Sequence, residues 1–235
     1  MPPLCLLFDS DGTLVDSEIL LAEVMAEVLS HHGLPFTALR YMREFRGVRF
    51  LTIVNTLEQA YGALAPDVLE EVESSLRAKM EDRMRAQLLP MPGMRDALIA
   101  LRDHDCAVVS NGPERKVRCA MQSSGLAEFF GDNLFSAYTL KLWKPDPRIY
   151  QAAARQMGYP LEQCVVIDDA AVGVQAGLEA GMHVIHFNHF PEHEQTPSGA
   201  ISMHHASELP AIIERLSRSL DMPMPHHRDD DEAFS

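Results

Sequence analysis

Asp9 and Asp11 stand directly after a short apolar run at residues 4–8, and Gly12 follows them. A run of this kind that ends at a turn signal is typical of a fully buried strand. Side chains at positions i and i+2 of an extended chain lie on the same side, so both carboxylates are expected in one small volume. Open α/β sheets bind ligands at such strand ends. Because the two carboxylates repel each other, the site requires a compensating cation or a shared proton.

Other interpretations of this pair are open on these residues alone. Asp9 could cap the following turn and Asp11 could be a solvated loop residue, because Asp-Gly dipeptides are common in turns generally. A calcium-binding helix-loop-helix is excluded, since its glycine lies at loop position 6, whereas Gly12 stands at position 4 counted from Asp9. Residues elsewhere in the chain are needed to distinguish a functional pair of carboxylates from ordinary turn residues.

Three further stretches place polar residues at or just after the ends of expected strands. One opens a helix and offers a hydroxyl and backbone N–H groups to an anion. A lysine stands in a proline-stiffened loop, and an apolar run at residues 165–167 ends in two more aspartates. These residues are Ser110, Asn111, Lys144, Asp168 and Asp169.

Parallel strand ends meet at one edge of a sheet, so these residues are expected to form one cluster. Carboxylate oxygens suit Mg²⁺, which keeps several waters and pairs with substrate phosphate. These are the residue types expected in a site that transfers phosphoryl groups by nucleophilic catalysis. Single positions have alternatives, since Asp168 and Asp169 could cap the next helix. Lys144 could pair with Asp146, and Ser110 could form a turn without touching a ligand.

The hydrophobic periodicity divides the chain into two kinds of structure. Helical spacing dominates residues 17–89, where no strand-like run occurs, and strand-helix alternation begins at residue 90. The alternation predicts an α/β fold, a Rossmann-like parallel sheet covered by helices on both faces. We therefore expect a core formed by residues 1–16 and 90–221, an inserted all-helical cap at 17–89, and a disordered acidic tail at 222–235.

Composition narrows the class of protein. The 235 residues are 46% hydrophobic and carry a formal net charge of −14, which argues against general nucleic-acid binding. No signal peptide is expected, and no apolar stretch approaches the roughly 20 residues of a membrane helix. The four cysteines contain no C-x-x-C pair and are expected to be reduced structural thiols of a cytoplasmic protein. They are Cys5, Cys106, Cys119 and Cys164.

Four motifs resemble, in order and spacing, those of the haloacid dehalogenase-like hydrolases. They are residues 9–15, Ser110-Asn111, Lys144-Pro145 and Asp168-Asp169. The helical insertion after the first motif looks like the cap of the beta-phosphoglucomutase-like branch of that superfamily. At subfamily level, residues 45–49, 110–113 and 135–147 resemble the bacterial 6-phosphogluconate phosphatases.

The resemblance implies a mechanism and a role for each motif residue. Asp9 would attack phosphorus and form an aspartyl-phosphate, and Asp11 would protonate the leaving alcohol and then activate water. Lys144 would neutralise the phosphate and the crowded carboxylates. The implied Mg²⁺ ligands are the Asp9 carboxylate, the Asp11 backbone carbonyl, Asp169, and Asp168 directly or through water. The implied phosphate-binding residues are Ser110, Asn111 and Lys144.

Two positions within the family pattern bear on the metal site and on the class of substrate. Ala170 stands where a serine often follows the acidic pair, which predicts somewhat weaker support of the metal site. Haloacid dehalogenases and phosphonate hydrolases lack an acid at the position of Asp11, so the sequence favours phosphate esters.

Substrate choice is expected to lie in the cap. Gly47 permits a tight approach, and the flanking Arg46 and Arg49 could reach a substrate carboxylate or hydroxyls; the alternative is a pair of solvated surface arginines. The histidines at 183–189 and 204–205 lack a coherent metal spacing.

The prediction for the whole chain is a magnesium-dependent phosphatase of sugar phosphates or phosphosugar acids, acting as a monomer or homodimer with no nucleic-acid or membrane partner. The alternatives are a sugar phosphomutase of the same family and a non-catalytic phosphometabolite sensor.

Overall fold

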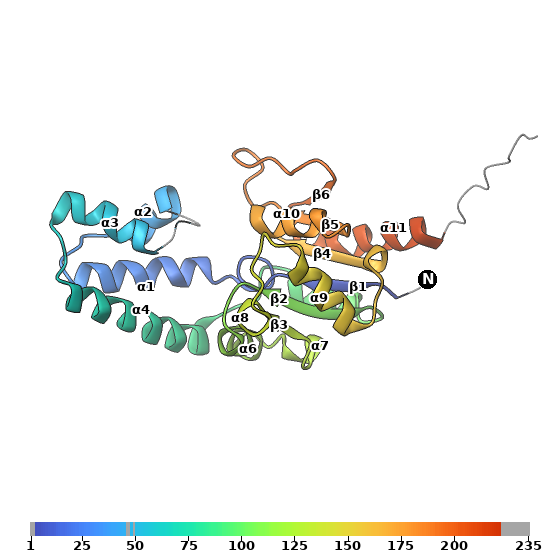
Figure 1. Cartoon of the computed structure of the whole chain (residues 1–235), viewed down its shortest axis with the longest axis horizontal. Coiled ribbons are helices and arrows are strands. Elements are labelled where there is room, and N and C mark those ends of the chain that lie inside the picture. The colour runs from blue at the N-terminus through green and yellow to red at the C-terminus, as the bar shows by residue number, and fades with distance from the viewer. Residues whose placement is uncertain (1–2, 46–47, 49, 222–235) are drawn as a thin grey trace, which may run out of the picture.

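A six-stranded parallel sheet forms the centre of the molecule, with the strand order β3-β2-β1-β4-β5-β6. The computed structural model describes residues 3–45, 48 and 50–221. Figure 1 shows helices on both sides of the sheet and a helical insertion that extends away from it. The strands are β1 Cys5–Phe8, β2 Asp105–Ser110, β3 Leu134–Ser136, β4 Cys164–Asp168, β5 His183–Phe187 and β6 Ala200–Met203. The predicted α/β class with a parallel sheet is confirmed.

Each central strand buries both of its faces. In β1, Leu6 and Phe8 pack into one hydrophobic cluster, whereas Cys5 and Leu7 pack into the other. Helices α5 Met94–Ala100, α6 Glu114–Ser123, α7 Ala127–Phe130 and α11 Leu209–Asp221 cover the first face. Helices α8 Ala137–Leu140, α9 Arg148–Met157 and α10 Ala171–Glu179 cover the second. Short 3-10 turns, η2 Leu161–Gln163 and η3 Ala206–Glu208, precede β4 and α11.

The helical insertion has a hydrophobic cluster of its own. It comprises α1 Glu18–His31, α2 Ala38–Arg40, the π-helical turn η1 Tyr41–Phe45, α3 Phe50–Tyr61 and α4 Pro66–Gln87. Two short chain segments connect it to the sheet and pair with each other. The Asp16 N–H donates to Leu89 O at 3.1 Å, and the Met91 N–H donates to Leu14 O at 2.9 Å.

β6 was missed by the sequence analysis. Its four residues lie at the edge of the sheet beside β5, and Ser202 interrupts the apolar pattern. A half-exposed edge strand of this length gives little periodic signal. In the described part of the chain, no helix is both long and apolar enough to cross a membrane.

Candidate active site

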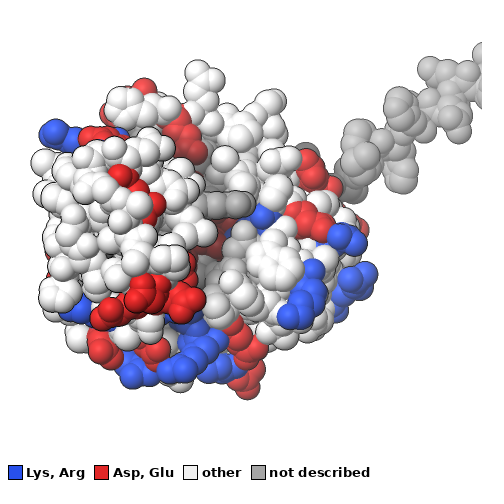
Figure 2. Space-filling view, turned by 60° about the vertical axis from the view of Figure 1, so that its left-hand side comes forward, with Lys and Arg blue, Asp and Glu red and all other residues white. Residues whose placement is uncertain are grey.

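The strand ends that carry the polar residues meet at one edge of the sheet. β1 lies between β2 and β4, and Phe8 is level with Val108 and Ile167. Asp9 therefore follows β1 near the ends of the two neighbouring strands, where β2 ends in Ser110 and β4 ends in Asp168. Figure 2 shows a hollow between the helical insertion and the sheet domain, with acidic and basic side chains at its floor.

Lys144 is a buried ammonium between two carboxylates. Its Nζ lies 2.5 Å from Asp9 Oδ1 and 2.7 Å from Asp168 Oδ2. Burial alone would lower the pKa of Lys144, but Asp168 and Asp9 outweigh burial and hold that pKa well above its usual range. Lys144 thus stays charged and offsets part of the repulsion among the acids. Asp146, its possible partner in the sequence, pairs with Arg148 instead.

Asp9 binds its proton more tightly than an ordinary aspartate. Burial raises the pKa of Asp9 to about 7; Lys144 opposes the rise, and Asp168 and Asp11 add to it. Metal ligands must be deprotonated, so a divalent cation at this carboxylate competes with that proton.

Both oxygens of Asp168 accept hydrogen bonds from protein donors. Oδ2 accepts from Lys144 and, at 2.8 Å, from the hydroxyl of Tyr150. Oδ1 accepts from the Ala170 N–H at 2.9 Å. A Cβ at Gly173 would overlap this carboxylate, so glycine is required there. Asp168 holds the lysine and the loop after β4, whereas Ala170, at the N-cap of α10, makes no side-chain cap.

Three carboxylates offer a site for a cation. Oxygens of Asp9, Asp168 and Asp169 lie within 4.8 Å of one another, and these three are the group with metal-binding geometry in the described residues. The Thr13 hydroxyl donates to Asp169 Oδ1 at 2.9 Å and accepts from the Asp169 N–H at 3.1 Å. A set of oxygen donors beside an open hollow fits Mg²⁺, which binds through one or two carboxylates and keeps several waters.

Asp11 has two partners, and both were missed as site residues by the sequence analysis. Lys116 Nζ lies 2.7 Å from Asp11 Oδ2, and the Ser17 hydroxyl donates to Oδ1 at 2.7 Å. Burial alone would raise the pKa of Asp11, but Lys116 and Ser17 hold it below its usual range. In this arrangement Asp11 is a carboxylate, the form that can take a proton from water.

The expected anion-binding residues lie beside the acidic cluster. The buried Ser110 hydroxyl accepts from the Gly112 N–H at 3.0 Å. Asn111 Oδ1 accepts from the Lys144 N–H at 2.8 Å, and Asn111 Nδ2 donates to Lys144 O at 3.3 Å. The amide side chain therefore holds the backbone of the lysine, a function that the motif alone did not indicate.

The structure brings together the motif residues but does not describe the expected specificity residues. Arg46, Gly47 and Arg49 lie outside the described residues. Tyr150 and Lys116 were missed because each stands in an amphipathic helix, where an apolar or charged residue has an ordinary structural explanation. Both stand in the first turn of a helix that begins just after an expected site segment, and this placement is the signal that could have found them. The cysteines are free thiols.

Comparison with known proteins gives consistent results. A family model described as haloacid dehalogenase-like hydrolase matches residues 4–181. The 6-phosphogluconate phosphatase of Escherichia coli is 31% identical over 206 residues, which cover 87% of this chain and 92% of that protein. The fructose-1-phosphate phosphatase of the same organism is 31% identical over 186 residues, covering 77% and 94%.

Solved structures with the same fold extend over almost the whole chain. A hydrolase from Deinococcus radiodurans, solved with bound phosphate and sodium, is 27% identical, with a TM-score of 0.74 and coverage of 92% of this chain and 97% of that one. A putative beta-phosphoglucomutase from Thermotoga maritima, 24% identical, has a TM-score of 0.75 and coverage of 90% and 99%. Because its sequence identity is low, the Thermotoga maritima structure supports the fold only.

Proposed function

The chain belongs to the haloacid dehalogenase-like hydrolases and to their phosphatases of phosphorylated metabolites, and from that premise we propose that it hydrolyses sugar phosphates or phosphosugar acids such as 6-phosphogluconate with Mg²⁺ as cofactor. The observation that supports this proposal most strongly is the buried Lys144 between Asp9 and Asp168. Asp11, which pairs with Lys116, lies on the same loop as Asp9. This arrangement provides a nucleophile, a cation for phosphate and a separate proton carrier.

In the first step, an Asp9 carboxylate oxygen forms a bond to phosphorus while the bond from phosphorus to the ester oxygen breaks. Asp11 in its protonated form gives its proton to the departing alkoxide oxygen. The Lys144 ammonium, together with Ser110 and the Asn111 N–H, holds the phosphoryl oxygens, and because Lys144 and Ser110 are buried these fixed groups act strongly. The product is an alcohol and an aspartyl-phosphate on Asp9.

In the second step, Asp11 as carboxylate takes a proton from water. The water oxygen bonds to phosphorus, the bond between phosphorus and the Asp9 oxygen breaks, and phosphate leaves with Asp9 restored. Asp11 must therefore be protonated in one half of the cycle and ionised in the other. Its contacts with Lys116 and Ser17 favour the ionised form, so we propose that substrate displaces Asp11 from these partners and that the freed carboxylate takes up a proton from solvent before the first step.

Mg²⁺ would be held by the Asp9 carboxylate, Asp169 and the Asp11 backbone carbonyl, where it supplies positive charge to the phosphoryl group. Asp168 uses both oxygens for Lys144, Tyr150 and Ala170, so we assign it to an indirect, water-mediated contact. Residues 17–89 would act as the cap over this site, with Arg46 and Arg49 as candidates for contact with the sugar portion. The cytoplasmic location and the monomeric or homodimeric state stay predictions.

The test is a kinetic panel with Mg²⁺ that includes 6-phosphogluconate, phosphoglycolate and hexose phosphates, with Asp9→Asn as the inactive control. We expect phosphate release from several of these esters and the highest kcat/KM for a sugar phosphate or phosphosugar acid. Conversion of one sugar phosphate isomer to another without phosphate release would instead identify a phosphomutase. Binding of the esters without any turnover would identify a sensor.

A further inference from the structure

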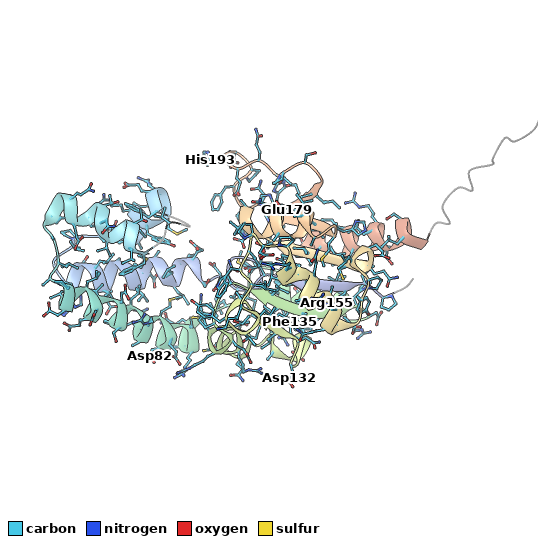
Figure 3. The ribbon with its side chains drawn as sticks, in the orientation of Figure 1. Asp82, Asp132, Phe135, Arg155, Glu179 and His193 are labelled. Atoms are coloured by element: carbon cyan, nitrogen blue, oxygen red, sulfur yellow. The ribbon has the colours of Figure 1, made fainter. Side chains whose placement is uncertain are left out.

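The loop between β5 and β6 is built around Asn188, a buried residue at its base. The Asn188 side-chain amide donates to Glu194 O at 2.7 Å, and its Oδ1 accepts from the Phe190 N–H at 2.9 Å. The Glu194 N–H in turn donates to Phe190 O at 2.8 Å. Figure 3 labels His193, which marks the outer part of this loop above α10. These bonds fix the path of the chain on both sides of His189.

His189 reaches from this loop to the catalytic loop after β1. Its Nε2 lies 2.7 Å from the backbone carbonyl oxygen of Gly12. A carbonyl oxygen only accepts hydrogen bonds, so Nε2 must carry a proton and donate it. The imidazole also lies against the ring of the buried Phe187, with centroids 4.2 Å apart. Since β4 lies between β1 and β5 in the sheet, this bond spans the strand that ends in Asp168.

Gly12 is the point at which the catalytic loop contacts the acidic cluster. Its φ is +84°, and a Cβ at this position would overlap the carboxylate of Asp169. The next residue, Thr13, exchanges two hydrogen bonds with Asp169. The peptide that joins Gly12 to Thr13 therefore lies between the Asp169 carboxylate and the His189 ring. A shift of that peptide would move the Thr13 hydroxyl on which the Asp169 side chain depends.

We propose that His189 is a positioning residue of the metal site: by donating to the Gly12 carbonyl it fixes the Gly12–Thr13 peptide, and through Thr13 it fixes the Asp169 carboxylate. The inference rests on the proposed function, because it assigns Asp169 as a metal ligand. His189 itself is outside the group of carboxylates with metal-binding geometry in the described residues. Its contribution is to orient a ligand through the backbone.

The test measures metal affinity directly, with Mn²⁺ as a spectroscopic probe titrated into the full chain and free Mn²⁺ followed by electron paramagnetic resonance. His189→Leu removes the donor, whereas His189→Gln retains an N–H donor and, like leucine, is uncharged. We expect His189→Leu to weaken Mn²⁺ binding about tenfold, as is usual when an outer-shell partner is lost, and His189→Gln to stay within about threefold of the wild type.

The matched control is His32→Leu, because the Nδ1 of His32 also lies close to a backbone carbonyl oxygen, that of Val28 at 2.9 Å, within the helical insertion. His32→Leu should leave Mn²⁺ affinity unchanged. In kinetics, His189→Leu should raise the metal concentration for half-maximal activity by the same factor, with KM for the ester unchanged at saturating metal. A general loss of folded protein would lower the number of sites without changing their affinity.

Wild-type Mn²⁺ affinity in folded His189→Leu would overturn the inference. If His189→Leu cannot be purified, His189→Met removes the donor with a flexible side chain of similar size, and the same comparison with His189→Gln decides. Failure of the proposed function has a different signature. The wild type would then release no phosphate from any ester, while the affinity comparison between His189→Leu and His189→Gln could still be made.

Discussion

The Lys116 ammonium and the Asp11 carboxylate form an ion pair of 2.7 Å that links the helix after β2 to the loop after β1. Asp11 is the residue assigned to carry protons in both halves of the reaction, so the pair bears directly on its protonation. Lys116 and Ser17 lower the pKa of Asp11 against the opposing effect of burial. The ion pair therefore stores Asp11 as a carboxylate until substrate arrives.

Lys116→Met should shift the pH dependence of turnover. Without the lysine, burial dominates and the pKa of Asp11 rises. The carboxylate left on Asp11 after the first step would then take a proton back from solvent at neutral pH, so less of it is available to activate water. We expect kcat at pH 7 to fall about tenfold, a part of the roughly 100- to 10,000-fold that general acid–base catalysis contributes, and to recover at higher pH. Arg115→Met is the control, because this exposed neighbour on α6 pairs with Glu81 instead. A pH profile of Lys116→Met that overlaps the wild type would rule out this role.

Asp9→Asn should stabilise the metal-free protein at alkaline pH. The folded-state pKa of Asp9, about 7, lies above the ordinary 3.8, so the folded state binds more protons between these values. The stability linked to this group is complete below about pH 4 and is lost as pH rises through 7. Asparagine removes the buried charge, and we expect the free energy of unfolding at pH 8 to rise by about 2 kcal/mol.

Denaturant titrations of wild type and Asp9→Asn at pH 5 and pH 8, both with a chelator, measure this difference. The gain should be smaller at pH 5, where Asp9 in the folded wild type is already largely protonated. An equal or larger gain at pH 5 would contradict the raised pKa. Metal affinity of the wild type should show the complementary trend and fall as pH drops below 7, because the proton and the cation compete for Asp9.

Gly12→Ala should damage both stability and metal binding. The φ of +84° disfavours a side chain, and the added Cβ would also overlap the Asp169 carboxylate. Gly33→Ala is the matched control, because Gly33 has a φ of +83° and no heavy atom within 4 Å of the added Cβ. Backbone strain should cost each variant about 1 kcal/mol of stability.

The two glycine variants should differ in their chemistry. We expect Gly12→Ala to lose at least about tenfold in Mg²⁺ affinity, as for other disturbed ligands, and Gly33→Ala to keep the wild-type value. Calorimetric titration with Mg²⁺ checks the difference. If both variants bind Mg²⁺ equally well, Asp169 is not held where the metal site requires it.

Tyr150→Phe should lower kcat without a comparable loss of fold. The Tyr150 hydroxyl shares Asp168 Oδ2 with Lys144, and its ring lies 5.3 Å from Nζ. Loss of this donor leaves a buried carboxylate oxygen with one partner fewer, which should draw Lys144 toward Asp168 and away from Asp9. The effect should be roughly 1–2 kcal/mol, or about tenfold in rate.

Tyr159→Phe provides the control for the tyrosine. Tyr159 also donates to an aspartate, Asp105 at 2.5 Å, but at an exposed position at the start of β2. Its activity should match the wild type. Steady-state kinetics on the best ester, together with thermal unfolding, separate the two variants; equal kcat for Tyr150→Phe and Tyr159→Phe would exclude a role of Tyr150 in setting Lys144.

The sequence was sufficient to predict the sheet and the positions of the motif residues, and the reason is geometric. Buried apolar runs followed by polar residues identify strand ends, and a parallel sheet brings such ends to one edge. Asp9, Asp168 and Lys144 therefore meet as expected. The residues that hydrogen-bond or pair with these catalytic groups could not be predicted in the same way. Tyr150 has the spacing of a core residue in α9, and Lys116 that of a charged residue in α6, so periodicity assigns both to ordinary structure.

Loops were the other part that the sequence did not determine. The bond from His189 to Gly12 joins residues 177 positions apart, and its geometry depends on how the loop after β5 folds over the end of β4. The side chain of Asn111 is similar, because its contact with Lys144 depends on two loops that approach only in the folded sheet. Local patterns in the sequence contain no information about contacts between loops that are distant in the chain.

Acid quenching during steady-state hydrolysis should trap the phosphoryl group that Asp9 carries during turnover. Digestion and mass spectrometry then look for a peptide with one phosphoryl group on Asp9. We predict this species in the wild type and its absence in Asp9→Asn. Asp11→Asn should form it more slowly, because the alkoxide is no longer protonated, and should then retain it, because water is no longer activated. Full phosphate release with no phosphorylated Asp9 in either the wild type or Asp11→Asn would exclude Asp9 as the nucleophile.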